Sequence, residues 1–454
     1  MWSFALVLAP ILMPVLPPQP PDRDQPVLHE IAQRVDPLTL KASITRLVGF
    51  GTRHTLSATN SRTRGIGAAR RWVGGTFRDY SKACGGCLEV QTPSMSVTGP
   101  RVPAAVTIEN VLAIQRGTTD PDRVVIIAGH LDSRVSDPMD ATSDAPGADD
   151  DGSGVAAVLE AARVLSRYKF PATIVYAVLS GEEQGLYGGK LLAQVAEQQH
   201  WRVEADLNND IIGNTHGQGG TFENGYVRVF SEGTKALETP AEGNDRRYQG
   251  GEVDSPSRQL GRYLADLADH YLAPFRARMV YRTDRYGRGG DQTPLLEAGY
   301  PAVRLTEASE NYDRQHQDLR SDGGIDYGDV AEALDVPYLA QVTRLNLIAL
   351  ASLAAAPAPP DGVTVSGAVS ADTTLAWSAV RGAANYRVWW RDTTEPRWRH
   401  FREAGSALSI KLDGVVIDDW FFGVQAVSSD GYASPVVFPG AAGAFGRSAL
   451  VPPP

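Results

Sequence analysis

Short apolar runs alternate with segments of helical periodicity through the first three quarters of the chain. Val124–Ile127 and Thr173–Leu179 are continuous apolar runs, as expected for strands that are buried on both faces of a sheet. Segments with apolar residues at helical spacing follow each run, at 152–168 and at 186–198. The alternation continues in later segments, at 226–230, 257–271, 302–305 and 330–353. It predicts an α/β fold, a three-layer sandwich around a mostly parallel central sheet.

The pattern changes after a segment of small residues and prolines, ASLAAAPAPP, at 351–360. Beyond it the helical period disappears, and short runs of β-forming residues take its place at 363–365, 374–377, 386–390 and 422–427. These runs predict a small all-β, immunoglobulin-like sandwich. The predicted organisation is a signal-like segment at 1–24, an α/β domain at 25–352, a linker at 353–360, a β-sandwich at 361–441 and a tail at 442–454.

The N-terminal segment contains a long uncharged apolar run. FALVLAPILMPVL, at 4–16, is shorter than the about 20 residues that span a bilayer and suits the apolar part of a secretory signal. No Lys or Arg precedes it, and no small-x-small cleavage site follows it. We expect a secreted or periplasmic protein without stable membrane insertion. The alternative is an apolar tail with no role in sorting.

Charge and cysteine content narrow the function classes further. The net charge is -10, and no run of Lys or Arg supplies the basic face of a general nucleic-acid binder. The only cysteines are Cys84 and Cys87, in a C-G-G-C loop, so a zinc finger lacks its second pair. We expect a local disulfide in an oxidising compartment, with a reduced pair as the alternative.

Acidic residues and histidines cluster where predicted strands end. In open α/β sheets, ligands bind beyond the carboxyl ends of the strands. The candidates are His130 and Asp132, Asp149–Asp151, Glu182 and Glu183, Asp210, and His316. Each residue alone could have a purely structural role, such as a hydrogen-bonded histidine at a strand end or an acidic residue at a helix start. Three consecutive aspartates exceed what a helix cap requires, and a bound cation would relieve their repulsion.

Taken in order, the pattern His, Asp, Glu-Glu, Asp, His resembles the two-zinc aminopeptidase family of the bacterial leucyl aminopeptidase type. The resemblance runs from about Pro37 to Leu353 and includes 49–53, 289–291 and 297–302. It implies two zinc ions per chain and a peptide substrate with a free N-terminus. By the same resemblance, the zinc ligands are His130, Asp150, Glu183, Asp210 and His316, with Asp150 bridging both ions.

Further roles follow from the same resemblance. Glu182 would be the general base, and Asp132 would orient His130. Asp291 falls in the segment that resembles the specificity pocket. Where relatives place a Tyr that stabilises the tetrahedral intermediate, this chain has Gln315, and Tyr312 is our candidate replacement.

The C-terminal region resembles a fibronectin type III domain, through an early Trp377, the strand Tyr386–Trp390 and the late strand 422–427. The sequence does not indicate what this domain binds.

Three other functions remain open. A related zinc carboxypeptidase would need a basic clamp, for which Arg282, Arg285 and Arg288 are candidates. A cyclase of the same fold would not need two complete zinc sites. A non-catalytic binding protein should have lost ligands, and none is lost here. The working metal, the preferred N-terminal residue and the physiological peptide are left open.

Overall fold

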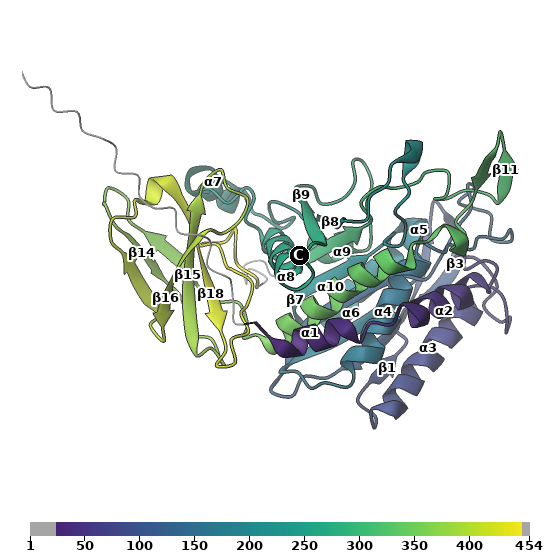
Figure 1. Cartoon of the computed structure of the whole chain (residues 1–454), viewed down its shortest axis with the longest axis horizontal. Helices are drawn as coiled ribbons and strands as arrows, with labels where there is room; N and C mark the ends of the chain where they lie inside the picture. Colours follow the sequence, from purple (N-terminus) through teal and green to yellow (C-terminus); the bar gives the residue numbers. More distant parts are fainter. Residues whose placement is uncertain (1–23, 447–454) are drawn as a thin grey trace, which may run out of the picture.

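A larger α/β body and a smaller all-β body make up the protein, as the sequence predicted (Figure 1). The computed structural model describes residues 24–446, so nearly all of the signal-like segment and the end of the tail lie outside the described residues. The large body holds the central sheet and the small body follows the Ala/Pro segment.

Eight strands form the central sheet, in the order β1-β4-β6-β5-β7-β10-β8-β9. The four middle strands β6, β5, β7 and β10 are parallel, whereas β1 and β4 on one side and the β10–β8 pairing are antiparallel. The strands are β1 (Glu89–Gln91), β4 (Val111–Gln115), β5 (Asp120–His130), β6 (Ala172–Leu179), β7 (Arg202–Asn209), β8 (Tyr226–Phe230), β9 (Arg276–Val280) and β10 (Ala302–Thr306).

Helices cover both faces of this sheet, which gives three layers (Figure 1). Neighbouring strand residues point to opposite layers: Val125 and Ile127 join one apolar cluster, and Val124 and Ile126 join the other. The first cluster contains α1 (Pro26–Gln33), α2 (Pro37–Val48), α3 (Ile66–Ala83), α4 (Gly152–Leu165), α8 (Pro256–Tyr271) and α10 (Val336–Ala355). The second contains α6 (Tyr187–Gln198) and α9 (Gln292–Glu297).

Shorter elements fill the connections. They are the hairpins β2 (Ser94–Gly99)–β3 (Val102–Glu109) and β11 (Arg320–Asp322)–β12 (Ile325–Tyr327), the helices α5 (Glu182–Gly185) and α7 (Pro240–Gln249), and the 3-10 turns η1 (Gln218–Gly220) and η2 (Ala331–Ala333). The sequence analysis did not anticipate the β2–β3 hairpin, which places Arg101 in a turn beside α5.

Helix α10 corrects the predicted start of the linker, because it continues to Ala355. Its alanine-rich last turn favours helix, and Arg123 donates to the carbonyl oxygens of Leu353 and Ala356 at the helix end. The helix is long and apolar enough to cross a membrane, but 83% of its apolar window is buried inside the protein. Such burial is typical of the core helix of a globular domain.

The small body consists of two three-stranded sheets packed around one apolar core. One sheet contains β13 (Thr364–Ser366), β14 (Thr373–Ala376) and β17 (Ser409–Leu412); the other contains β16 (His400–Gly405), β15 (Asn385–Asp392) and β18 (Trp420–Val427), with the turn η3 (Ile417–Asp419) before β18. Trp377 and Tyr386 pack in this core with ring centroids 5.5 Å apart. The fibronectin type III assignment stays a prediction.

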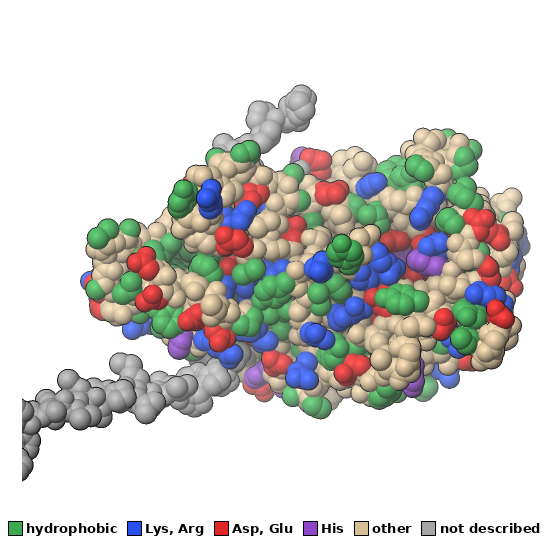
Figure 2. All heavy atoms as spheres, turned by 90° about the horizontal axis from the view of Figure 1, so that it is seen from above, with side chains coloured by type: hydrophobic (Ala, Val, Ile, Leu, Met, Phe, Trp, Pro, Cys, Tyr) green, Lys and Arg blue, Asp and Glu red, His purple; other side chains and the backbone are tan. Residues whose placement is uncertain are grey.

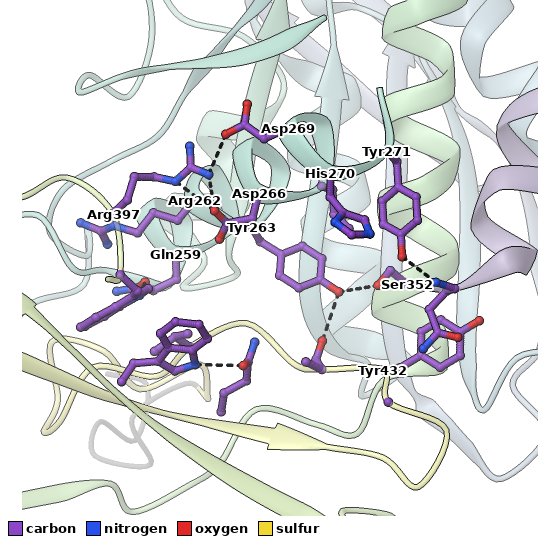
Figure 3. Close-up of a pocket in the computed structure, with 18 of the residues that line it drawn as sticks. Gln259, Arg262, Tyr263, Asp266, Asp269, His270, Tyr271, Ser352, Arg397 and Tyr432 are labelled. Atoms are coloured by element: carbon purple, nitrogen blue, oxygen red, sulfur yellow. Dashed lines mark hydrogen bonds and ion pairs between the residues drawn. The ribbon is translucent and has the colours of Figure 1, made fainter. Parts of the chain in front are cut away.

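The two bodies meet along α8 through buried polar contacts. Asp254, just before α8, binds Arg262 of the same helix at 3.0 Å and Arg391 of β15 at 2.8 Å, and all three side chains are buried. Beside this triad lies a cavity of about 500 Å³, where Tyr263 of α8 bonds Ser352 of α10 and Arg397 bonds Asp266 (Figure 3). The small body is therefore docked on the large one and not merely tethered to it.

Candidate metal centre

The predicted ligands converge at one end of the central sheet. His130 ends β5, Glu183 follows β6, and Asp210 follows β7. Asp150 lies in the loop that leads into α4, and His316 lies in the long loop after β10. Because these loops leave parallel neighbouring strands at their carboxyl ends, residues that are far apart in sequence meet there.

Two groups of possible metal ligands result, and they share one residue. His130, Asp150 and Asp210 form the first group, and Asp150, Glu183 and His316 form the second; within each group the ligand atoms lie within 4.8 Å of one another. Oδ1 of Asp150 is 3.1 Å from Nε2 of His130, and Oδ2 is 3.0 Å from Nε2 of His316. The carboxylate of Asp150 thus faces both groups, one oxygen to each.

The donor atoms fit zinc. Imidazole nitrogens with carboxylate oxygens are typical zinc ligands, and three protein donors per ion leave positions for water or substrate. Burial works against ionisation of Asp150, yet the facing His316 and His130 hold the pKa of its carboxyl well below the usual range. Asp150 is therefore ionised, which is the state a bridging ligand needs.

The neighbouring aspartates in the same run do different work. Asp151 caps α4, since its Oδ1 accepts a hydrogen bond from the backbone N–H of Gly154, and its Oδ2 accepts one from the N–H of His130. Oδ1 of Asp149 accepts a hydrogen bond from the N–H of Gly213. Asp149 and Asp151 thus accept hydrogen bonds from the backbone, and Asp150 is the aspartate of the run that faces both histidines.

Asp132 holds the site by a different contact from the predicted one. Its carboxylate is 3.7 Å from Nδ1 of His130, too far for a hydrogen bond, and the ring instead lies 3.0 Å from the backbone carbonyl of Asp132. The carboxylate accepts hydrogen bonds from the N–H groups of Gly181 and Glu183. These backbone donors compete for the carboxylate, so Asp132 joins the end of β5 to the turn that carries both glutamates.

Glu182 lines the same cavity but belongs to neither ligand group. Burial, reinforced by the charges of Glu183 and Asp210 and opposed by His130, raises the pKa of its carboxyl well above the usual range. A carboxyl with a raised pKa beside a metal centre is suited to proton transfer.

Two arginines that sequence reasoning missed contact the ligands. Nε of Arg134 is 2.8 Å from Oε2 of Glu183, and its Nη2 is 2.6 Å from Nδ1 of His316. Arg304, fully buried on β10, forms an ion pair with Asp210. The position of Arg134 directly after the H-L-D-S segment is the one sequence feature that could have pointed to it. Arg304 lies in an apolar strand, and no sequence feature points to its role.

The centre opens into a cavity of about 540 Å³. Neither Tyr312 nor Asp291 is among its lining residues: the Tyr312 side chain is exposed, and Asp291 is buried with Oδ1 bonded to the N–H of Gly189. Their predicted substrate contacts gain no support from these positions. Gln315 is not among the lining residues either, and its amide donates to Glu310.

Cys84 and Cys87 form a disulfide directly after α3, as the sequence predicted. The bond lies on the large body near β1, and neither cysteine lines the metal cavity.

Comparisons with known proteins agree with this geometry. Residues 110–332 match the family model described as peptidase family M28. A probable zinc metalloprotease of Pyrenophora tritici-repentis is 42% identical over 93% of this chain and 88% of its own, and one of Pyricularia oryzae is 43% identical over 94% and 86%.

Solved structures show the same fold at low identity. LapB of Legionella pneumophila superposes with a TM-score of 0.53 at 17% identity, covering 74% of this chain and 76% of its own. The LapA aminopeptidase of the same organism gives 0.51 at 19%, covering 78% and 80%. With the family match, the relatives and the ligand geometry together, the chain belongs to peptidase family M28 and is a zinc metallopeptidase.

Proposed function

We propose that this zinc metallopeptidase is an exported aminopeptidase that holds two zinc ions. The observation that carries the two-ion assignment is the carboxylate of Asp150, whose oxygens face His130 and His316 separately. His130 and Asp210 would complete one site, and Glu183 and His316 the other. When bound, the zinc ions would supply Lewis-acid chemistry, polarising the scissile carbonyl and acidifying the attacking water.

Glu182 would move the proton. Its carboxylate lines the cavity next to both ligand groups without belonging to either, so it is available to accept a proton from the attacking water. The same group would then deliver that proton to the departing amine. Arg134 would hold Glu183 and His316 in place during this transfer, because it contacts both.

Two observations support cleavage from the amino end and export. The acidic side chain of Glu182 lines the cavity and belongs to neither ligand group, so it would attract the positively charged α-ammonium group of a peptide. The Cys84–Cys87 disulfide suits an oxidising compartment, in agreement with the signal-like segment at 4–16.

The test is hydrolysis of aminoacyl-4-nitroanilides and of their N-acetylated counterparts, with and without a chelator. We expect cleavage of the free-amine substrates alone, lost on chelation and restored by zinc. If folded, zinc-loaded protein cleaves none of them but releases C-terminal residues from N-blocked peptides, the protein is a carboxypeptidase. That second candidate is favoured by Arg285 and Arg288, which line the cavity and could clamp a substrate carboxylate.

A further inference from the structure

Basic side chains surround the metal centre. Five cationic residues line the cavity of about 540 Å³ together with the acidic metal-centre residues: Arg101, Arg134, Lys190, Arg285 and Arg288. Figure 2 shows Lys and Arg side chains gathered beside acidic side chains and a histidine on one face of the larger body. The cavity thus holds charges of both signs.

Two of the five have no acidic partner among the described residues. Arg101, in the β2–β3 turn, donates to the backbone carbonyl of Glu183, and Lys190 of α6 donates to the carbonyl of Gly185. Lys190 also lies over the ring of Tyr187, with 5.2 Å between Nζ and the ring centroid. Both side chains are anchored by neutral groups, so each leaves a full positive charge at the mouth of the cavity.

The side of the cavity that carries Arg285 and Arg288 also has more positive than negative charges. Glu310 binds Arg228 at 2.6 Å, Arg288 at 3.1 Å and Arg285 at 3.4 Å, so one carboxylate is shared by three guanidinium groups. Burial acts against ionisation, yet these arginines lower the pKa of Glu310 to about 2. Asp284 also binds Arg285, at 3.0 Å, so Glu310 and Asp284 together offset two of the three positive charges and leave one.

Three of the four acids that line the cavity would be engaged by metal, and only Glu182 would not. Asp150, Glu183 and Asp210 would each bind a divalent cation, which cancels their charge as seen by a substrate. A peptide that brought only an α-ammonium group would then enter a cavity with excess positive charge. A peptide that also brings a negative group would be attracted, because opposite charges lining a cleft raise local substrate concentration.

We propose that the mouth of this cavity is a carboxylate subsite formed by Arg101, Lys190 and Arg288. The inference rests on the proposed aminopeptidase function and names its substrate class, peptides with a carboxylate close to the scissile bond. That carboxylate has two sources, an acidic side chain on the peptide or the C-terminus of a dipeptide. Planar guanidinium groups and an ammonium group suit either one.

Matched substrate pairs separate the two sources. Glu-4-nitroanilide against Gln-4-nitroanilide tests the side chain, and Leu-Ala against Leu-Ala amide tests the C-terminus. We expect kcat/KM of the zinc-loaded protein to be about tenfold higher for the carboxylate member of at least one pair, as a few ion pairs at an accessible site would give. Because exposed charges are screened, the ratio should fall with added salt.

Variants connect the preference to the named residues. In the double variant Arg101→Gln/Lys190→Gln we expect the carboxylate-to-amide ratio to fall by about three- to tenfold. The matched control is Arg402→Gln, which removes an exposed charge from β16 in the small body and should leave the ratio unchanged. Zinc content and circular dichroism verify that each variant is folded and loaded.

The affinity for glutarate, measured by calorimetry, tests the subsite without any hydrolysis of a substrate. We expect it to bind the zinc-loaded wild type at least about threefold more tightly than the double variant, since both would hold the same metals. Hydrolysis of both pairs at equal rates, with equal glutarate binding in wild type and variant, overturns the carboxylate subsite and leaves the aminopeptidase function standing. No hydrolysis at all, with glutarate binding weakened in the variant, overturns the aminopeptidase function and leaves the subsite standing.

Discussion

Oδ2 of Asp150 lies 3.0 Å from Nε2 of His316, while Oδ1 of Asp150 faces His130. One carboxylate therefore takes part in two ligand groups, and neither group is complete without it. In the proposed two-ion centre, binding at both positions would therefore depend on this one side chain.

Asp150→Ala should therefore reduce zinc binding at both positions and not at one. We expect the zinc content to fall from about two ions per chain to below one, measured by mass spectrometry after dialysis. The matched control is Asp322→Ala, which removes an exposed aspartate from β11. Zinc content at the wild-type level in Asp150→Ala would show that Asp150 is not the bridge.

Glu182→Gln should separate metal binding from turnover. Glu182 lines the cavity but is in neither ligand group. We expect kcat to fall by about 10²- to 10⁴-fold, the usual contribution of a general base. Zinc content should stay at the wild-type level, measured on the same sample. Substantial remaining activity in a fully loaded variant would remove Glu182 from the role of base.

Asp254→Ala should strongly destabilise the protein, because it leaves Arg262 and Arg391 buried without a counter-charge. We expect the free energy of unfolding to fall by about 3 to 5 kcal/mol, measured by denaturant unfolding. The control is Asp372→Ala, since Asp372 pairs with Lys411, which is 57% exposed, and its loss should cost under about 1 kcal/mol. Equal effects of the two substitutions would contradict the importance of the buried triad.

Glu232→Gln should stabilise the protein at alkaline pH. Burial, opposed by Lys235 and Arg258, raises the pKa of Glu232 from 4.5 to about 8. Because the unfolded chain releases this proton at lower pH than the folded one, the wild type should lose stability as pH rises from about 4.5 to about 8. The glutamine variant lacks this titration and should be more stable by up to about 5 kcal/mol at pH 8.5, because each unit of pKa shift corresponds to about 1.4 kcal/mol.

Thermal unfolding of both proteins between pH 5 and pH 8.5 measures this difference. The two curves should approach each other towards pH 5, where Glu232 is protonated in the folded protein. Parallel curves over the whole range would contradict a raised pKa at Glu232.

Much of the fold could be predicted because its strands are unambiguous. The runs at 124–127 and 173–179 lie inside β5 and β6, and the segment at 186–198 matches α6 to within one residue. The N-terminal helices α1–α3 and the β2–β3 hairpin were not predicted. The strands of that hairpin are largely exposed, so they lack the apolar pattern on which strand prediction depends.

The predicted ligand set came from the family resemblance, and its five members form the two groups of possible ligands in the structure because their motifs occur at strand ends that meet. The partners of the ligands did not follow. Arg304 acts through a pairing with Asp210 that exists only once β7 and β10 are adjacent. Asp132 contacts the His130 ring as predicted, but through its backbone carbonyl and not its carboxylate, a difference that no sequence pattern reveals.

The polar contact between the two bodies affects the stability of the whole chain. Helix α8, which carries Arg262, packs against β10, the strand that bears Arg304 and leads into the loop of His316. Cutting the chain at the Ala/Pro segment would remove Arg391 and leave Asp254 and its helix facing water. The small body thus stabilises the larger one. We expect the two bodies to unfold in a single thermal transition, and we expect a chain that lacks the small body to be unstable.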